Sequence, residues 1–150
     1  MLLRDALLAY AHFLAILFLT AVLCAELAVY RQELAAPVAR RLQRIDLMFG
    51  IAAAVVIVTG VARVVFGLKG ADFYLHNPIF WTKMGLFLLV GLLSIVPTVH
   101  YLRWNATLSA GADSIRDEPR TYRRIRSLLI AEIVVLAFIP LCAALMSRGL

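Results

Sequence analysis

Long apolar segments alternate with short polar ones along the whole chain. The apolar segments cover four ranges, approximately residues 6–30, 47–67, 80–102 and 127–147. At about 1.5 Å per residue, a helix of roughly twenty residues crosses the hydrocarbon core of a bilayer, which is about 30 Å thick. The pattern therefore predicts an all-α protein in which residues 1–150 form one domain, a four-helix transmembrane bundle. Short connections favour up-down topology.

Composition supports a membrane location for this bundle. The chain is 63% hydrophobic and has a mean hydropathy of +0.91, whereas soluble domains contain roughly 45 to 50% apolar residues. The first apolar segment is too long for a signal peptide and has no small-residue cleavage site. Asp5 beside Arg4 also weakens any basic region before it. We therefore expect the first segment to be a retained helix.

The net charge of +6 comes mainly from two loops. These loops contain Arg31, Arg40, Arg41 and Arg44 after the first helix, and Arg103, Arg116, Arg120, Arg123, Arg124 and Arg126 after the third. The loop between the second and third helices has little beyond Lys69. The positive-inside rule predicts that both arginine loops are cytoplasmic and both termini are on the outer, periplasmic side. We expect a multi-pass protein of the bacterial inner membrane whose arginines attract anionic lipids, and no nucleic-acid partner.

Local signals refine the ends of the helices and suggest an oligomer. Asn77 followed by Pro78 predicts a helix cap and a first-turn proline, and the segment 105–118 is expected to be a solvated loop. Small residues recur at close-packing spacing on the first two helices, at Ala21, Ala25 and Ala28, and at Gly50, Ala53 and Ala54. They indicate tight helix packing, and a bundle this slim favours a homo-oligomer, a homodimer in the simplest case.

Ionisable residues inside a membrane are costly, so they are the best indicators of function in this sequence. Helical depth places His12, Arg63 and Lys83 in an outer layer, with His76 in the adjoining loop. The two cations either extend to lipid head groups or hold an anionic ligand, such as the carboxylates of a cofactor. His12 either bonds a neighbouring helix or ligates a metal or haem iron.

A second layer of ionisable residues is expected nearer the cytoplasm. It contains Glu26, Asp46, His100 and Glu132. Glu26 follows His12 by fourteen positions, which puts both near one helix face and predicts a polar stripe toward the bundle interior. Glu26 and Asp46 are close enough to the interface to pair with arginines. Glu132 has no basic residue one turn away along its helix. It has either a structural role or a role in proton handling, and Glu26 would share the second role.

Motifs of soluble enzymes are absent from the sequence. It has no P-loop, no glycine fingerprint for nucleotides, no histidine pair at i, i+4 and no cysteine pair at metal spacing. The sequence therefore indicates no metal site built from protein ligands alone, and it does not decide whether the protein is an enzyme.

Four stretches resemble a known family. They are YAHFLAIL around His12, RIDLMFGIAAAVVIVTGVARVVFG through Arg63, KGADFYLHNPIFWTKMGLFLLVGLLSIVPT through Lys83, and IPLCAALMSRG near the end. The chain resembles the bacterial integral-membrane family of unknown function 2214 over nearly its whole length. That resemblance implies four transmembrane helices and no particular activity.

A more distant resemblance points to a cofactor. The layout looks like the HemJ-type protoporphyrinogen oxidases and the CopD-like membrane proteins, because His12 and Trp81-Thr82-Lys83 occupy comparable places. The second histidine-bearing pattern of HemJ is missing here. This resemblance implies a haem b or porphyrin site at His12 and Lys83. Depth in the membrane predicts the remaining roles: His12 as ligand, Arg63 and Lys83 at the propionates, and His76 as second ligand because His100 lies near the opposite face. The alternative is a non-enzymatic scaffold or a small-solute transporter without cofactor.

Overall fold

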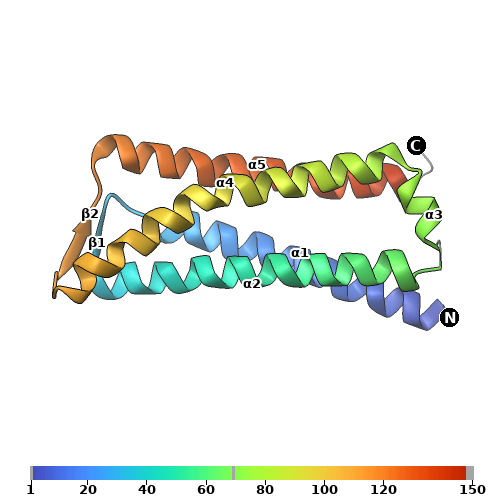
Figure 1. Cartoon of the computed structure of the whole chain (residues 1–150), viewed down its shortest axis with the longest axis horizontal. Coiled ribbons are helices and arrows are strands. Elements are labelled where there is room, and N and C mark those ends of the chain that lie inside the picture. The colour runs from blue at the N-terminus through green and yellow to red at the C-terminus, as the bar shows by residue number, and fades with distance from the viewer. Residues whose placement is uncertain (1, 69, 148–150) are drawn as a thin grey trace.

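Four long helices dominate the computed structural model, which describes the backbone of residues 2–68 and 70–147 and side chains up to residue 144 (Figure 1). Lys69 lies outside the described residues. The long helices are α1 (Leu2–Val29), α2 (Ala36–Phe66), α4 (Pro78–Ser109) and α5 (Pro119–Ser147). A short helix, α3 (Gly70–Leu75), and two short strands, β1 (Glu33–Ala35) and β2 (Ser114–Arg116), connect them. The predicted four-helix bundle is confirmed.

The bundle consists of two helical hairpins. α1 packs mainly against α2, and α4 packs mainly against α5. α1 begins and α5 ends at the same end of the molecule, beside α3, and the strands lie at the opposite end (Figure 1). We call these the α3 end and the β end. The termini therefore share one end, as predicted, while the side of the membrane that each end faces stays a prediction.

The outer surface of the bundle is apolar. Leu17, Val58 and Leu88 are each more than 60% exposed on α1, α2 and α4. All four long helices are long and apolar enough to cross a membrane. A soluble protein does not expose so much continuous apolar surface, so these side chains face lipid and the chain is an integral membrane protein.

The β end is more ordered than the sequence indicated. β1 and β2 pair in antiparallel register, with Leu34 opposite Ile115, and both of these side chains are buried. Segment 105–118 was expected to be a solvated loop, but it begins inside α4 and includes β2. α2, α4 and α5 also extend past the predicted spans 47–67, 80–102 and 127–147 at this end, because hydropathy detects the lipid-crossing part of a helix and not its polar extension.

The predicted packing through small residues within one chain is confirmed only at Ala53, which packs against the core. Ala21, Ala25, Gly50 and Ala54 are exposed on the outside of the bundle. The interior is filled instead by larger apolar side chains, among them Leu19, Leu23, Leu42, Val90 and Leu129. The small residues are therefore available for contacts outside this chain.

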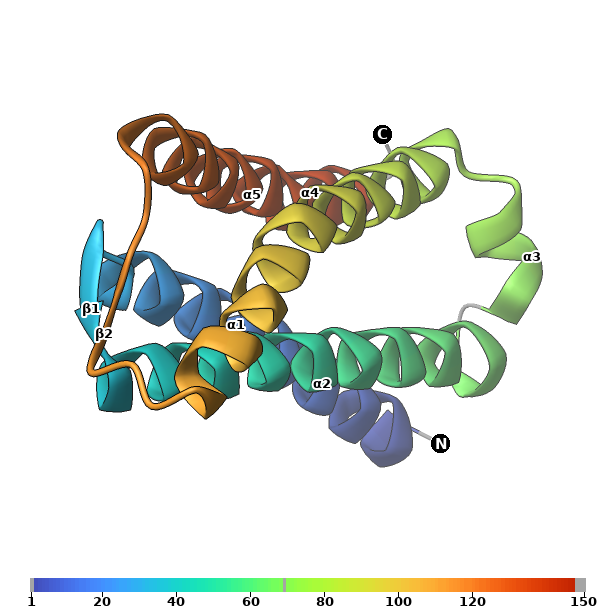
Figure 2. The same ribbon diagram turned by 60° about the vertical axis from the view of Figure 1, so that its left-hand side comes forward.

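Two local predictions about the third long helix can be compared with the structure. The Asn77 side chain accepts a hydrogen bond from the Ile79 amide at 2.8 Å, and Pro78 is in the first turn, so the predicted cap is confirmed. Pro97 lies inside α4, which changes direction in its middle part as it passes from α5 toward α2 (Figure 2). A proline removes one helical hydrogen bond, and this explains the bend.

Candidate functional site

Three basic side chains from three helices meet in the half of the bundle near the α3 end. His12 on α1 interacts electrostatically with Arg63 on α2 and Lys83 on α4, and the two cations also interact with each other. We call His12, Arg63 and Lys83 the basic cluster. Their common depth was predicted from helical rise alone, and the structure brings them together.

His12 is held in a defined orientation. Its ring is 8% exposed, and its Nδ1 lies 2.9 Å from the Thr59 hydroxyl oxygen. That hydroxyl lies 2.8 Å from the Val55 carbonyl and 3.1 Å from the Val56 carbonyl, so its single proton is donated there. In the tautomer that fits these two contacts, the Thr59 oxygen accepts from His12 and the ring proton is on Nδ1. Nε2 therefore has a free lone pair, the form in which histidine ligates a metal.

A glycine on the neighbouring helix makes room for this ring. A Cβ atom at Gly60 would lie 3.2 Å from Cε1 of His12, closer than ordinary van der Waals contact. The position therefore accepts no side chain without displacing the imidazole. The His12 ring therefore lies between α1 and α2, in contact with Gly60 and Thr59 of α2.

The two cations of the basic cluster have aromatic neighbours and, among the described residues, no carboxylate partner. The Arg63 guanidinium lies 5.6 Å from the Phe13 ring centre, and Lys83 Nζ lies 5.5 Å from that of Phe80. No ion pair joins either cation to a carboxylate in the described chain, and the buried Nε of Arg63 has no hydrogen-bond acceptor. A buried donor without acceptor costs about 1 to 3 kcal/mol, so an anion would be stabilised here.

His76 lies apart from the basic cluster. It is exposed, follows α3, and donates from Nδ1 to the Asp72 carbonyl at 2.9 Å. Its Nε2 remains unengaged, but no hydrogen bond or ring contact joins it to His12 in the described part of the chain. The role of His76 as a second ligand stays a prediction.

Carboxyl groups gather in the other half of the bundle. Glu26 on α1, Asp46 on α2 and Glu132 on α5 interact electrostatically, and we call them the carboxyl cluster. Glu26 and Glu132 are 1% and 0% exposed, and neither oxygen of Glu132 has a hydrogen-bond partner among the described side chains. His12 and Glu26 both face the interior of the bundle, which confirms the predicted polar stripe on α1.

The expected arginine pairing of Glu26 and Asp46 is wrong. Asp46 instead accepts a hydrogen bond from the Thr98 hydroxyl at 2.7 Å, and Tyr101 lies beside Glu26. Glu26 has no arginine partner within the described residues. The polar extensions of the helices take the arginines past the end of the apolar core, so they lie beyond reach of these carboxyls.

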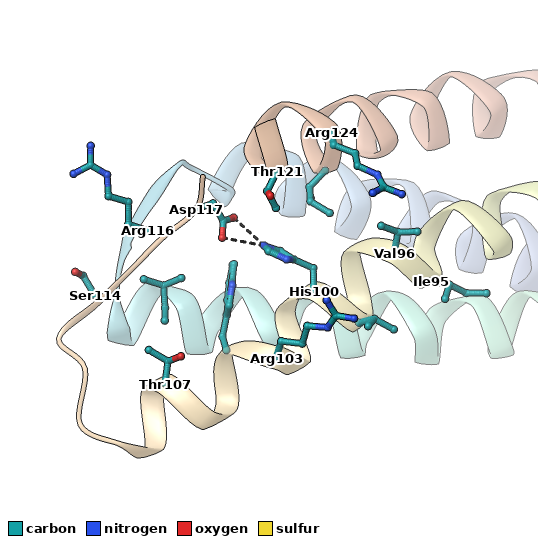
Figure 3. Close-up of a pocket in the computed structure, with 14 residues that line it drawn as sticks. Ile95, Val96, His100, Arg103, Thr107, Ser114, Arg116, Asp117, Thr121 and Arg124 are labelled. Carbon is teal, nitrogen blue, oxygen red and sulfur yellow. Dashed lines mark hydrogen bonds and ion pairs between the residues drawn. The ribbon is translucent and has the colours of Figure 1, made fainter. Parts of the chain in front are cut away.

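A hydrogen-bonded network at the β end was missed by the sequence analysis. Asp117 accepts a hydrogen bond from Nε2 of His100 at 2.9 Å (Figure 3). It also accepts one from the Tyr30 hydroxyl at 2.6 Å. Gln32 holds the backbone of Asp117 in place: the Asp117 amide donates to the Gln32 carbonyl at 2.8 Å, and the Gln32 side chain donates to the Asp117 carbonyl at 3.4 Å. Burial, reinforced by Asp117, raises the pKa of the Tyr30 hydroxyl. The only sequence signal was a buried-type residue pattern, Ile115 between polar neighbours, inside an otherwise polar loop.

The arrangement of these groups limits the cofactors that the protein could hold. Within the described residues no group of three or more His, Cys, Asp or Glu side chains could hold a metal ion. A single histidine with a free Nε2 beside two cations suits a ligand that has its own metal centre and carries carboxylates. The carboxyl cluster, by contrast, suits the binding and release of protons.

Comparison with known proteins places the chain in a family but not in a functional class. No curated protein and no solved structure matches it, so the more distant resemblance to HemJ-like and CopD-like proteins stays a prediction. One family model matches residues 4–150, and its description is "Predicted membrane protein". The match covers all four long helices, and the chain belongs to this family of membrane proteins, DUF2214.

Proposed function

We propose that this protein binds haem b or a related porphyrin in the half of the membrane near the α3 end. His12 would ligate the iron through Nε2, and Arg63 and Lys83 would hold the propionates. The observation that carries the proposal is the combination of a histidine bonded through Nδ1 and two cations without a carboxylate partner among the described residues. Bound haem would supply electron transfer, whereas the protein supplies ligation, charge and exclusion of water.

The surroundings of His12 support this role in two ways. Thr59 sets the tautomer that leaves Nε2 unprotonated, as an acceptor behind a metal-ligating histidine commonly does. A propionate is stable in a membrane only beside fixed positive charge or an aqueous face. Arg63 lies in the last turn of α2, and Lys83 lies near the beginning of α4, so both are close to the α3 end. A propionate bound there would have positive charge beside it and an aqueous face nearby.

The test is the absorption spectrum of purified protein titrated with haemin. We expect a Soret band that His12→Ala abolishes or shifts, while Arg63→Gln weakens retention without removing the iron ligand. Thr59→Val should lower affinity about 10- to 100-fold by releasing the tautomer. Thr20→Val is the matched control, because Thr20 bonds only the Ile16 carbonyl of its own helix. Identical haem uptake with and without His12 would refute the site.

The membrane environment forms part of the same proposal. We place the β end in the cytoplasm of a bacterial inner membrane, because the arginines of both loops lie at that end. Each arginine near the surface is attracted to anionic lipid by about 1 kcal/mol. The exposed small residues on α1 and α2 support a homodimer.

A second candidate function is proton-coupled transport of a small solute. The observation that favours it is the carboxyl cluster, above all the buried Glu132, whose oxygens have no hydrogen-bond partner among the described residues. The assay is proton flux into vesicles containing the protein, and Glu132→Gln should abolish the flux while leaving the fold intact. A colourless protein with flux supports this function over haem binding. A colourless protein without flux supports a scaffold instead.

A further inference from the structure

A cavity of about 760 Å³ opens at the β end between α4, β2 and α5. Its polar part contains the His100–Asp117 pair together with Arg103, Arg116 and Arg124. Figure 3 shows Arg103 on α4 and Arg124 on α5 flanking His100, while Arg116 extends away from the pair. The cavity is separate from both the basic cluster and the carboxyl cluster.

The electrostatics of the cavity favour an anion. No side-chain hydrogen bond or ion pair is formed by its three arginines within the described residues. Its one carboxylate, Asp117, is already engaged by His100 and Tyr30. Thr121, in the first turn of α5, also lines the cavity, and the free amides of a first helical turn add partial positive charge. Net positive charge is therefore left without a counter-ion inside a concave site.

The other wall of the cavity is apolar and joins the lipid-facing surface. Ile95, Val96 and Val99 line it from α4, and Ile95 and Val99 are 53% and 41% exposed. They lie one to two turns further into the apolar part of the helix than Arg103. A ligand that fills the cavity would thus have its charged end at the arginines and an apolar chain along α4.

We propose that this cavity binds the phosphate group of a membrane amphiphile. Arg103 and Arg124 bind the phosphate oxygens, for which the guanidinium fork is well suited. His100, which also lines the cavity, is oriented by Asp117 through Nε2. The acyl or isoprenoid chain lies against Ile95 and Val99. This differs from general attraction of anionic lipid to the surface, because it requires a phosphate at one defined place.

The experiment measures binding by the fluorescence of Trp104, which lines the cavity. The chain contains two tryptophans, so Trp81→Phe leaves Trp104 as the only one. The protein in detergent is titrated with dihexanoyl phosphatidic acid, dihexanoyl phosphatidylcholine and inorganic phosphate. We expect phosphatidic acid to bind at least tenfold more tightly than either of the other two.

Variants separate the defined site from its alternatives. Arg124→Gln should lower the affinity for phosphatidic acid about tenfold, whereas Arg123→Gln, its neighbour outside the cavity, should change it less than twofold. Ile95→Asn should weaken phosphatidic acid and leave inorganic phosphate unchanged. Equal effects of the two arginine variants would overturn the proposal in favour of general surface charge. Inorganic phosphate binding as tightly as phosphatidic acid would overturn the assignment to an amphiphile.

Discussion

Tyr30→Phe isolates one hydrogen bond in the network at the β end. The Tyr30 side chain is fully buried, and its hydroxyl donates to the Asp117 carboxylate at 2.6 Å. Phenylalanine keeps the ring contacts of this side chain with Tyr101, Trp104 and Tyr122, whose ring centres lie within 6.5 Å. The substitution therefore removes the hydroxyl and little packing.

The expected loss follows from the kind of bond. A hydrogen bond to a charged group contributes about 1.5 to 3 kcal/mol to the free energy of unfolding. For a chain of this length, 1 kcal/mol corresponds to about 2 to 4 °C in melting temperature, so we expect a decrease of about 3 to 12 °C. The measurement is thermal unfolding in detergent at neutral pH, followed by tryptophan fluorescence. Tyr10→Phe, at a position 66% exposed, is the control.

The stability of the protein at alkaline pH provides a second, independent measurement of the hydrogen bond between Tyr30 and Asp117. The pKa of Tyr30 is raised above its ordinary value of 10.0 by burial and by Asp117, so above that pH the unfolded chain loses the proton while the folded one keeps it. The stabilisation by Tyr30 is complete below pH 10 and decreases above it, at about 1.4 kcal/mol per pH unit. The difference between wild type and Tyr30→Phe should therefore shrink above pH 10. A variant that melts within 1 °C of wild type and follows the same alkaline curve would refute this account of the network.

Two further predictions concern the arrangement in the membrane. Reporters fused after Arg44 and after Asp113 should be cytoplasmic and one after Leu150 external, and an external signal at Asp113 would reverse the orientation. The protein should form a homodimer in detergent or lipid, and a leucine at Ala25 or Ala54, both exposed on the bundle surface, should dissociate it. Molecular mass across a concentration series measures this, and a wild-type protein that is monomeric throughout would contradict it.

The sequence predicted those features that depend on position along a helix. The common depth of His12, Arg63 and Lys83 follows from helical rise, and so does the shared face of His12 and Glu26. These quantities need no knowledge of how the helices pack, because each is a property of one helix crossing one membrane.

Features that depend on contacts distant in the sequence were not predictable in the same way. Strands of three residues have no measurable periodicity, so Ile115 between polar neighbours did not indicate its pairing with Leu34. The burial of Asp117 was not predictable either, because an acidic residue in a polar loop is usually solvated. Its hydrogen bonds with Tyr30 and His100 explain why it is buried. The small residues gave a clear signal that was interpreted too narrowly. Their spacing shows that a helix face permits close packing, but it does not show whether the partner is a helix of the same chain or of another.

The strand pair at the β end has a consequence for how the protein is made. β1 connects the two helices of the first hairpin, and its partner β2 connects those of the second. During synthesis, the first hairpin is inserted in the membrane while β1 still has an unpaired edge, and that edge is covered only after most of the chain has been translated. The ladder thus joins two halves that enter the membrane at different times. Because each hairpin makes most of its contacts internally, the halves could be encoded as two genes and still find each other through these three residue pairs.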